Sequence, residues 1–229
     1  MIIFFMFLGL LALVLINVPI AVALAVVASA AMVFAHGPDV LPNVALVMMD
    51  GATNFPLIAI PLFILAGAIM NSTGISRRLI AFASAIFGFV KGGLAMVNIG
   101  ASLFFAEISG SAVADVAALG SILIPSMKKK GYPAPFAAAV TSSSATLAVI
   151  IPPSIPMILY AVMAQSSVVQ LFVAGIVPGV LGGFLMMVVA HRFAVHYNYP
   201  VEEVFKVSQV VATFKDAALA FTLPLIILG

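Results

Sequence analysis

Two carboxylates, two serines and a glycine lie together in residues 107–115, which read Glu-Ile-Ser-Gly-Ser-Ala-Val-Ala-Asp. Apolar runs flank them, over residues 94–106 and 116–124, in a chain that is 65% hydrophobic and only 7% charged. Polar groups between such runs are costly in hydrocarbon, so they are expected to face protein, water or an ion. We therefore treat this stretch, which includes Glu107 and Asp115, as the first candidate for a functional site.

Basic residues border this stretch, with Lys91 before it and three lysines at 128–130 after it. Basic residues beside membrane segments favour the cytoplasmic side. If both borders are cytoplasmic, each arm of about 15 residues reaches ~22 Å, which passes the midplane of a ~30 Å hydrocarbon core without crossing it. We therefore expect residues 92–127 to form a re-entrant helical hairpin with its tip at Ser109-Gly110-Ser111. The alternative is one ordinary crossing with a polar kink.

A second interruption is expected in residues 134–164. Residues 134–150 favour a helix that carries hydroxyl groups at positions 141–144 and 146. Three prolines within residues 152–156 then remove three backbone donors and must break it. An apolar piece over residues 157–164 completes a discontinuous helix, interrupted near the same membrane depth as the hairpin tip.

Open helix ends at these two breaks can do chemistry. The second arm of the hairpin begins near Ser111 with a partial positive charge, and the helix at 134–150 ends in free carbonyl groups with a partial negative charge. Carbonyl and hydroxyl oxygens suit Na⁺, and amide donors at a helix N-terminus suit a carboxylate. This pattern is expected of a secondary transporter with its site at the membrane midplane.

Individual polar residues also have simpler explanations. Asp115 in the first turn of the second arm is favoured by the helix dipole, whether or not it binds Na⁺. Glu107 ends the first arm, where the dipole disfavours it, so we expect it to have a partner or a proton. The hydroxyls of Ser142, Ser143 and Thr146 either line the ion site or bond to their own helix backbone.

Composition limits the class of protein. The mean hydropathy of +1.33 and several apolar segments near ~20 residues predict an all-α polytopic membrane protein in a lipid bilayer. The net charge of +2, without basic patches interleaved with aromatics, does not suggest nucleic-acid binding, and the absence of cysteine excludes thiolate chemistry. The three histidines lie at segment boundaries, so a serine nucleophile has no base and we expect no enzyme. A channel or a structural membrane subunit remains an alternative.

The other segments complete a predicted topology. Residues 2–35 favour one long, retained helix interrupted at Asn17 and Pro19, with two short helices as the alternative. Residues 36–50 are expected to be a polar loop, and Pro56 lies in the first turn of a helix that runs to about residue 70. The remaining expected segments are an interfacial helix at 77–90, a returning helix at 171–190, an amphipathic stretch at 202–216 and a further apolar segment from 217. The corresponding division is 1–90 for scaffold helices and interfacial arm, 91–165 for the transport element, 166–199 for the returning helix, and 200–229 for the cytoplasmic stretch with the start of a second repeat.

The sequence resembles the large membrane subunit of tripartite ATP-independent periplasmic (TRAP) transporters. The resemblance extends over the whole chain. The matching residues are 107–115, Gly120, Ile124-Pro125, Met127, Gly131-Tyr132, 136–139, 141–143, 150–154, 56–61 and Leu62-Phe63.

This resemblance implies an elevator-type, sodium-coupled importer of a small organic acid anion, such as a dicarboxylate, a 2-oxo acid or sialic acid, in the bacterial inner membrane. It implies the ion-transporter-superfamily fold of two inverted repeats, and Na⁺ as coupling ion without another cofactor. The implied partners are a small four-helix membrane subunit and a periplasmic substrate-binding protein. Ser109, Gly110 and Ser111 correspond to the hairpin tip at the sodium and substrate site, and Pro152, Pro153 and Ser154 to the broken-helix clamp. Family members are about twice as long, so this chain corresponds to the first repeat and the opening of the second.

Overall fold

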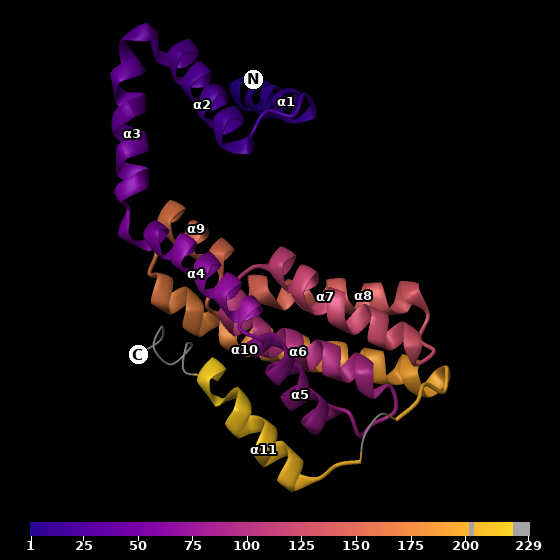
Figure 1. The fold of residues 1–229 in the computed structure, drawn as a ribbon. Coiled ribbons are helices and arrows are strands. Elements are labelled where there is room, and N and C mark those ends of the chain that lie inside the picture. The colour runs from indigo at the N-terminus through magenta and orange to yellow at the C-terminus, as the bar shows by residue number, and fades with distance from the viewer. Residues whose placement is uncertain (202–203, 222–229) are drawn as a thin grey trace. The chain divides into compact units, whose positions relative to one another are not determined.

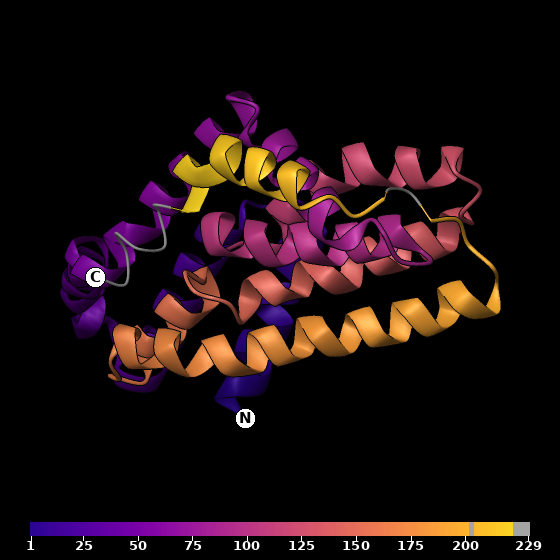
Figure 2. The same cartoon turned by 90° about the horizontal axis from the view of Figure 1, so that it is seen from below.

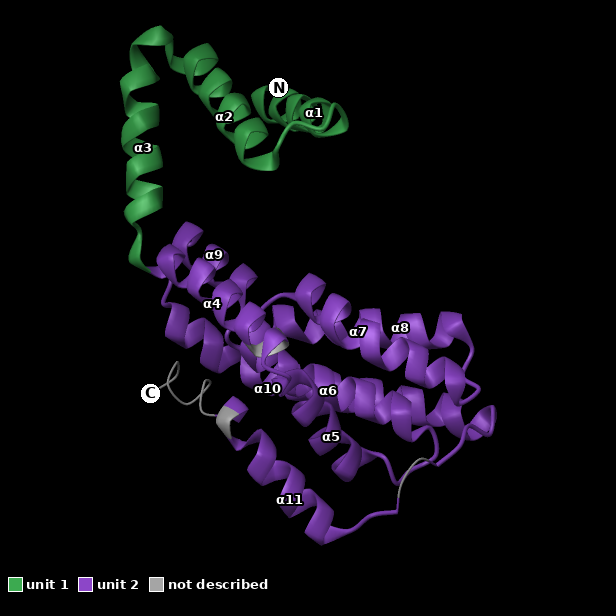
Figure 3. Cartoon of the chain, in the orientation of Figure 1, with its two compact units in different colours: residues 1–55 green, residues 56–229 purple. Residues whose placement is uncertain are grey.

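The computed structural model describes residues 1–201 and 204–221, and every regular element within them is helical. The chain forms two compact units, residues 1–55 and residues 56–229 (Figure 3). Each unit is described by itself. The all-α architecture expected from the composition is confirmed, while the functional division at residues 90, 165 and 199 stays a prediction.

The first unit begins with two helices, α1 (Ile2–Leu15) and α2 (Ile20–His36), which pack against each other. The expectation of one long helix was therefore wrong, and the alternative of two short helices is correct. Asn17 adopts a left-handed backbone conformation with φ of 68°, which ends α1. Pro19 then precedes α2, where its missing N–H is no loss because the first N–H groups of a helix have no partner inside it.

A short 3₁₀ turn, η1 (Pro38–Val40), and the helix α3 (Leu41–Thr53) follow where a polar loop was expected. Pro42 lies in the first turn of α3, a position that tolerates proline, so it starts the helix rather than breaking it. The apolar residues 44–49 then continue the helix. The loop prediction gave too much weight to Asp39 and Asp50, which lie in η1 and near the end of α3.

The second unit contains the remaining elements, shown in Figure 1. They are α4 (Phe55–Ser72), α5 (Ile75–Phe87), α6 (Gly93–Ser109), α7 (Ala112–Lys129), α8 (Ala134–Ala145), η2 (Thr146–Val149), α9 (Ile155–Met163), α10 (Val168–His196), α11 (Val207–Ala217) and η3 (Ala218–Phe221). The helices expected after Pro56 and over 77–90 are present with shifted ends, and α11 lies in the region where an amphipathic stretch was expected. Glu202, Glu203 and most of the predicted last apolar segment lie outside the described residues.

The helix α6 lies at the centre of the second unit (Figure 1), and thirteen of its residues are buried. One core cluster joins α6 to α5, α7 and α11 through residues such as Phe82, Phe105 and Leu119. A second cluster joins it to α8, η2 and α10 through Ile99, Leu147 and others. Because α6 is covered on both sides, most of its residues are apolar, and small residues allow the neighbours to approach closely.

The longest helix, α10, runs along the second unit as the long orange helix in Figure 2. Its 29 residues extend beyond the predicted range 171–190. By length and hydropathy it is the one described helix that could cross a membrane by itself, while Pro38–Thr53 and Phe55–Ile69 meet that criterion only when they are taken together. Gly179 lies directly against the side chain of Ile151, so α10 packs tightly on the predicted break at residues 150–154.

Candidate functional site

The predicted hairpin tip is a helix break. Gly110 follows α6 in the left-handed conformation with φ of 58°, and Ser111 is extended and caps α7 by accepting a hydrogen bond from the N–H of Ala114 at 3.4 Å. Serine is a preferred residue at such a helix start. The break therefore lies within residues 109–111, as the sequence predicted, and the re-entrant path of residues 92–127 stays a prediction.

Asp115 anchors this break from the first turn of α7. Its side chain is fully buried, and one carboxylate oxygen accepts a short hydrogen bond from the hydroxyl of Ser109. The N–H of Ser111 donates to the same Ser109 oxygen at 3.2 Å. The second carboxylate oxygen of Asp115 is buried without a hydrogen-bond partner among the described residues. An orphan carboxylate oxygen in an apolar bundle is costly unless a cation or proton satisfies it.

The second break separates η2 from α9 over residues 150–154. The helix α8 tightens into the 3₁₀ turn η2 before it ends, and the Pro152–Pro153 peptide bond is cis. Ser154 is fully buried and extended; its oxygen accepts from the N–H of Met157 at 3.4 Å, while its hydroxyl donates to the carbonyl oxygen of Val149 at 2.7 Å. This serine therefore bridges its own break.

The two breaks touch each other through their backbones. The N–H of Ile155, the first residue of α9, donates to the carbonyl oxygen of Gly110 at 3.2 Å. A Cβ atom on Gly110 would lie only 2.7 Å from the carbonyl oxygen of Pro153, so only glycine fits there. The expectation that both interruptions lie at one level is supported by this direct contact, which the sequence could not show.

The two helix starts differ in what they leave open. At α9, the N–H of Ile155 is bonded to Gly110, Pro156 has no N–H, and the N–H of Met157 is bonded to Ser154. At α7, the N–H groups of Ala112 and Val113 donate to no group in the described part of the chain. The positive end of α7 is thus available to an anion, while that of α9 is already satisfied.

Sequence reasoning missed a pair of buried polar contacts between α6 and α8. Asn98 donates to the hydroxyl of Thr141 at 2.7 Å, and the hydroxyls of Ser102 and Ser144 are 2.8 Å apart. All four residues are almost completely buried. Their spacings of four on α6 and three on α8 put each pair on one helix face, and this spacing is the signal that could have revealed them.

The predicted hydroxyls of Ser142, Ser143 and Thr146 lie on the exposed side of α8 and η2. Ser142 donates to the carbonyl of Ala138 at 2.9 Å and Thr146 to that of Ser143 at 2.6 Å, which is the self-bonding alternative considered from the sequence. No hydrogen bond joins them to the tip within the described residues. Glu107 is half-buried one turn before the tip and has no hydrogen bond or ion pair with another described residue.

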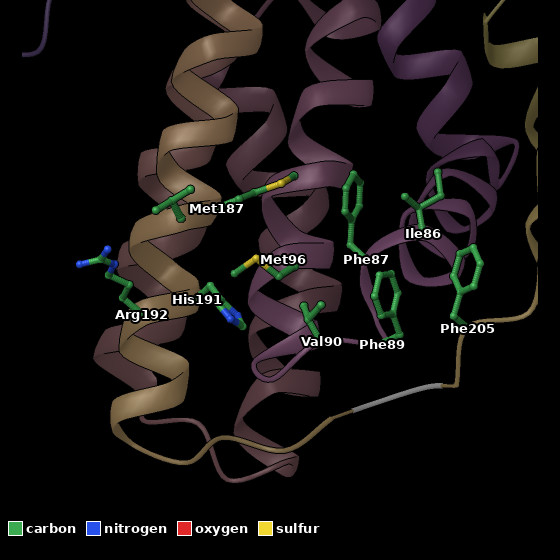
Figure 4. A pocket seen from close by; sticks show the side chains of 10 residues that line it. Ile86, Phe87, Phe89, Val90, Met96, Met187, His191, Arg192 and Phe205 are labelled. Atoms are coloured by element: carbon green, nitrogen blue, oxygen red, sulfur yellow. The ribbon is translucent and has the colours of Figure 1, made fainter.

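A large apolar cavity of about 630 Å³ lies between α5, α6 and α10, at the end of α6 that is remote from the tip. Phe87, Phe89 and Phe205 form part of its lining, and its polar side chains are His191 and Arg192 (Figure 4). None of its lining residues belongs to the tip or to the 150–154 break. Because this cavity lies away from both breaks, the candidate site is the meeting point of the two breaks.

An all-helical chain in which two interrupted helices meet backbone to backbone inside an apolar bundle has the architecture of a membrane permease. The chain belongs to the family described as "Tripartite ATP-independent periplasmic transporter, DctM component", which residues 7–229 match. The family predicted from residues 107–115 and 150–154 is therefore confirmed.

Several curated relatives carry the same type of name. The chain is 41% identical over 192 residues to the C4-dicarboxylate TRAP transporter large permease protein DctM of Pseudomonas aeruginosa, covering 84% of this chain and 45% of that protein. It is 39% identical over 214 residues to the 2,3-diketo-L-gulonate TRAP transporter large permease protein YiaN of Escherichia coli, covering 93% and 50%. It is 40% identical over 176 residues to the sialic acid TRAP transporter permease protein SiaT of Haemophilus influenzae, covering 77% and 29%. The chain thus spans half or less of these relatives, which are transporter permease subunits and not enzymes.

Proposed function

We propose that this chain forms one half of the translocation site of a sodium-coupled importer of small organic acid anions. The observation that carries the proposal is the buried, unpartnered carboxylate oxygen of Asp115 beside the open start of α7. A cation and an anion can be held side by side there, because oxygen donors and unpaired N–H groups meet at one break.

The cation site is built from hard oxygen donors. The second carboxylate oxygen of Asp115 supplies the charge, and the hydroxyls of Ser109 and Ser111 lie in the same break. The last carbonyls of α6, at Ile108 and Ser109, accept from no backbone N–H in the described residues and carry the negative end of that helix. Oxygen ligands of this kind, taken from unwound backbone and side chains, are those that coordinate Na⁺ in secondary transporters.

The anion is bound by backbone N–H groups rather than by a basic side chain. The free N–H groups of Ala112 and Val113 point along the axis of α7 out of its first turn, which is the position where helices bind carboxylates. Pro152, Pro153 and Ser154 close the site from the other break without taking part in the charge balance. Ser142, Ser143 and Thr146 complete the site from the side of α8 that is exposed in this chain.

The substrate class and the partners follow from the relatives, whose names specify C4-dicarboxylates, 2,3-diketo-L-gulonate and sialic acid. All are acids, so the class proposed for this chain is a small carboxylate. A small four-helix membrane subunit and a periplasmic binding protein complete the proposed transporter in the bacterial inner membrane. The chain spans half or less of each of these relatives, so we assign the other half of the site to the rest of such a permease.

The test is uptake of labelled dicarboxylate, sialic acid or 2-oxo acid into proteoliposomes that contain the complete transporter around this chain. We expect uptake that requires an inward Na⁺ gradient and the binding protein, and that Asp115→Asn reduces at least tenfold. Asparagine keeps the size and one acceptor oxygen, so the tip is retained while the charge is lost. The matched control is Ser126→Ala on the same helix, whose hydroxyl bonds only to its own backbone at 2.8 Å. Uptake that proceeds equally in Na⁺ and choline, or that survives Asp115→Asn, contradicts the proposal and favours a channel or a structural subunit.

A further inference from the structure

A second cavity in the second unit differs from the others because its polar side chains gather around one positive charge. It has a volume of about 760 Å³ and lies between the turn that joins α4 to α5 and the first half of α7. Small residues of α7 form one wall. The polar lining consists of Ser72, Thr73, Ser76, Arg77 and Ser121.

The guanidinium of Arg77 supplies N–H donors to this cavity. The hydroxyls of Ser72 and Ser121 already donate to backbone carbonyls, at 2.8 and 2.9 Å. The Arg77 side chain is exposed and has no hydrogen bond or ion pair with any residue of the described ranges 1–201 and 204–221. No carboxylate lines the cavity, and Asp115 on the adjacent turn of α7 is fully buried with Ser109.

The neighbouring Arg78 provides an internal comparison. Its guanidinium donates to the carbonyl oxygen of Asp216 in α11 at 3.5 Å, and Arg78 does not line the cavity. A basic residue that only fixes membrane orientation can point in any direction, because that rule depends on charge alone. Consecutive residues of a helix point about 100° apart, so the two arginines serve different surfaces, and Arg77 is the one that lines the cavity.

The cavity begins beside the hairpin tip. Ala114 lines it, and the N–H of Ala114 donates to the side chain of Ser111. On the other side, a Cβ atom on Gly67 of α4 would lie 3.7 Å from Cα of Ser109, so α4 touches the tip. The six residues from Gly67 to Thr73 advance about 9 Å along a helix, so the α4–α5 turn lies about 9 Å along the chain axis from the contact with the tip.

We propose that Arg77 holds the carboxylate substrate in this cavity as it passes between the tip and the end of α7 that carries Lys128–Lys130. This inference rests on the proposed function and adds a residue to it. The guanidinium can bind a carboxylate with two parallel hydrogen bonds. The hydroxyls of Ser72 and Ser121, which donate to backbone carbonyls, keep the cavity polar without donating to the substrate.

Because the chain has no cysteine, the charge of the cavity can be measured directly in the complete transporter. Ser121→Cys places one thiol in the cavity. Its labelling rate is measured with two methanethiosulfonate reagents, one with an anionic sulfonate group and one with a cationic trimethylammonium group. We expect Arg77→Gln to slow the anionic reagent and to accelerate the cationic one, each by about fivefold, the effect of one unit charge at about 4 Å in water. Arg77→Lys is expected to retain the original preference, and Arg78→Gln to change neither rate by more than about twofold.

A transport measurement tests whether the cavity serves the substrate. In the complete transporter, organic acid is supplied on the side of the membrane where Lys128–Lys130 lie. Arg77→Gln is expected to raise the half-saturating concentration of organic acid at least fivefold and to leave the half-saturating concentration of Na⁺ unchanged. If wild-type uptake is Na⁺-driven but Arg77→Gln behaves like Arg78→Gln, the role of Arg77 is refuted while the proposed function stands. If the wild type shows no Na⁺-driven uptake, the proposed function fails, and the role of Arg77 in it fails as well.

Two further outcomes contradict the inference. If Ser121→Cys is labelled by neither reagent, the cavity is not open to water. If the effect of Arg77→Gln on half-saturation disappears in vesicles without anionic lipids, the arginine binds a lipid headgroup and not the substrate.

Discussion

Each of the two helix breaks that meet in this protein has a serine before the next helix, and the two serines have different roles. Ser111 and Ser154 both stand in extended conformation before a helix, and each accepts from an N–H three residues later at 3.4 Å. Ser154 is fully buried, and its hydroxyl donates a hydrogen bond to the carbonyl oxygen of Val149. Ser111 is partly exposed, and its hydroxyl donates to no group in the described residues. One break is thus closed on itself, while the other is left open for a ligand.

The same contrast extends to the backbone. The start of α9 is satisfied by Gly110, Ser154 and a proline, whereas the start of α7 has two free N–H groups. A transport site needs one fixed support and one surface that can exchange ligands. We expect the break at 150–154 to be the support and the break at 109–111 to be the binding surface, and substitutions in and near the two breaks test this difference.

The largest effect is expected at the contact between the two breaks. Gly110→Ala combines a left-handed backbone, which costs an alanine about 1 kcal/mol, with a Cβ placed 2.7 Å from the Pro153 oxygen. We expect a loss of about 2–4 kcal/mol in mixed-micelle unfolding. Gly74→Ala is the matched control, because φ there is 75° and no atom lies within 4 Å of the new Cβ, so about 1 kcal/mol is expected. Equal losses of unfolding free energy in both variants would show that a Cβ atom at residue 110 does not clash with Pro153.

The two serines come next. Ser154→Ala removes a helix cap and leaves the buried carbonyl of Val149 unpaired, so we expect a loss of about 1–2 kcal/mol in unfolding and an unchanged half-saturating Na⁺ concentration. Ser111→Ala removes a partly exposed cap, with about 0.5–1 kcal/mol expected, but it should raise the half-saturating Na⁺ concentration severalfold. The comparison fails if the two variants exchange these phenotypes.

A smaller effect is expected where α6 joins α8. Thr141→Val keeps the shape of the side chain and removes the acceptor of the 2.7 Å bond from Asn98. Hydrogen bonds between membrane helices contribute about 0.6 kcal/mol on average, up to about 1.7. We expect a loss of about 1 kcal/mol in mixed-micelle unfolding, and in a double-mutant cycle Asn98→Ala should add less to Thr141→Val than it costs alone. Strict additivity would indicate that the bond contributes nothing.

The smallest effect is expected at Ser142. Its hydroxyl is exposed and bonded only to its own helix, so Ser142→Ala should change the free energy of unfolding by less than about 0.5 kcal/mol. If this variant nevertheless weakens Na⁺-driven uptake, Ser142 contributes to the site as the sequence predicted. If uptake is unchanged, the site on this chain is confined to the two breaks.

The positions of the breaks could be predicted from sequence because their causes are local. Gly110 between two serines and three prolines within residues 152–156 leave a helix few ways to continue. The helix α3 was missed because Pro42 and two aspartates resemble loop residues, although proline in a first turn and acids near the ends are compatible with a helix. The sequence signals for the breaks were interpreted correctly, but proline and aspartate in residues 36–50 were given too much weight as loop residues.

The contacts that make the site could not be predicted from sequence. Which of the hydroxyls at 141–146 face the core depends on the rotation of α8 against α6, and both faces of α8 have similar residues. Thr141 and Ser144 proved to be the buried members, while Ser142, Ser143 and Thr146 are exposed. Likewise, the unpartnered oxygen of Asp115 and the bond from Ile155 to Gly110 depend on how the segments pack, and no local sequence pattern specifies that packing.

The most direct test of the account is whether Na⁺ itself stabilises the protein through Asp115. Unfolding of the complete permease would be followed in detergent with NaCl and with choline chloride at the same ionic strength. At a Na⁺ concentration ten times the dissociation constant, we expect a gain of about 1.4 kcal/mol over choline. Asp115→Asn should remove the gain and Ser126→Ala should retain it. Equal stability of the wild type in both salts, or a gain that persists in Asp115→Asn, would contradict the assignment of the sodium site to the open break.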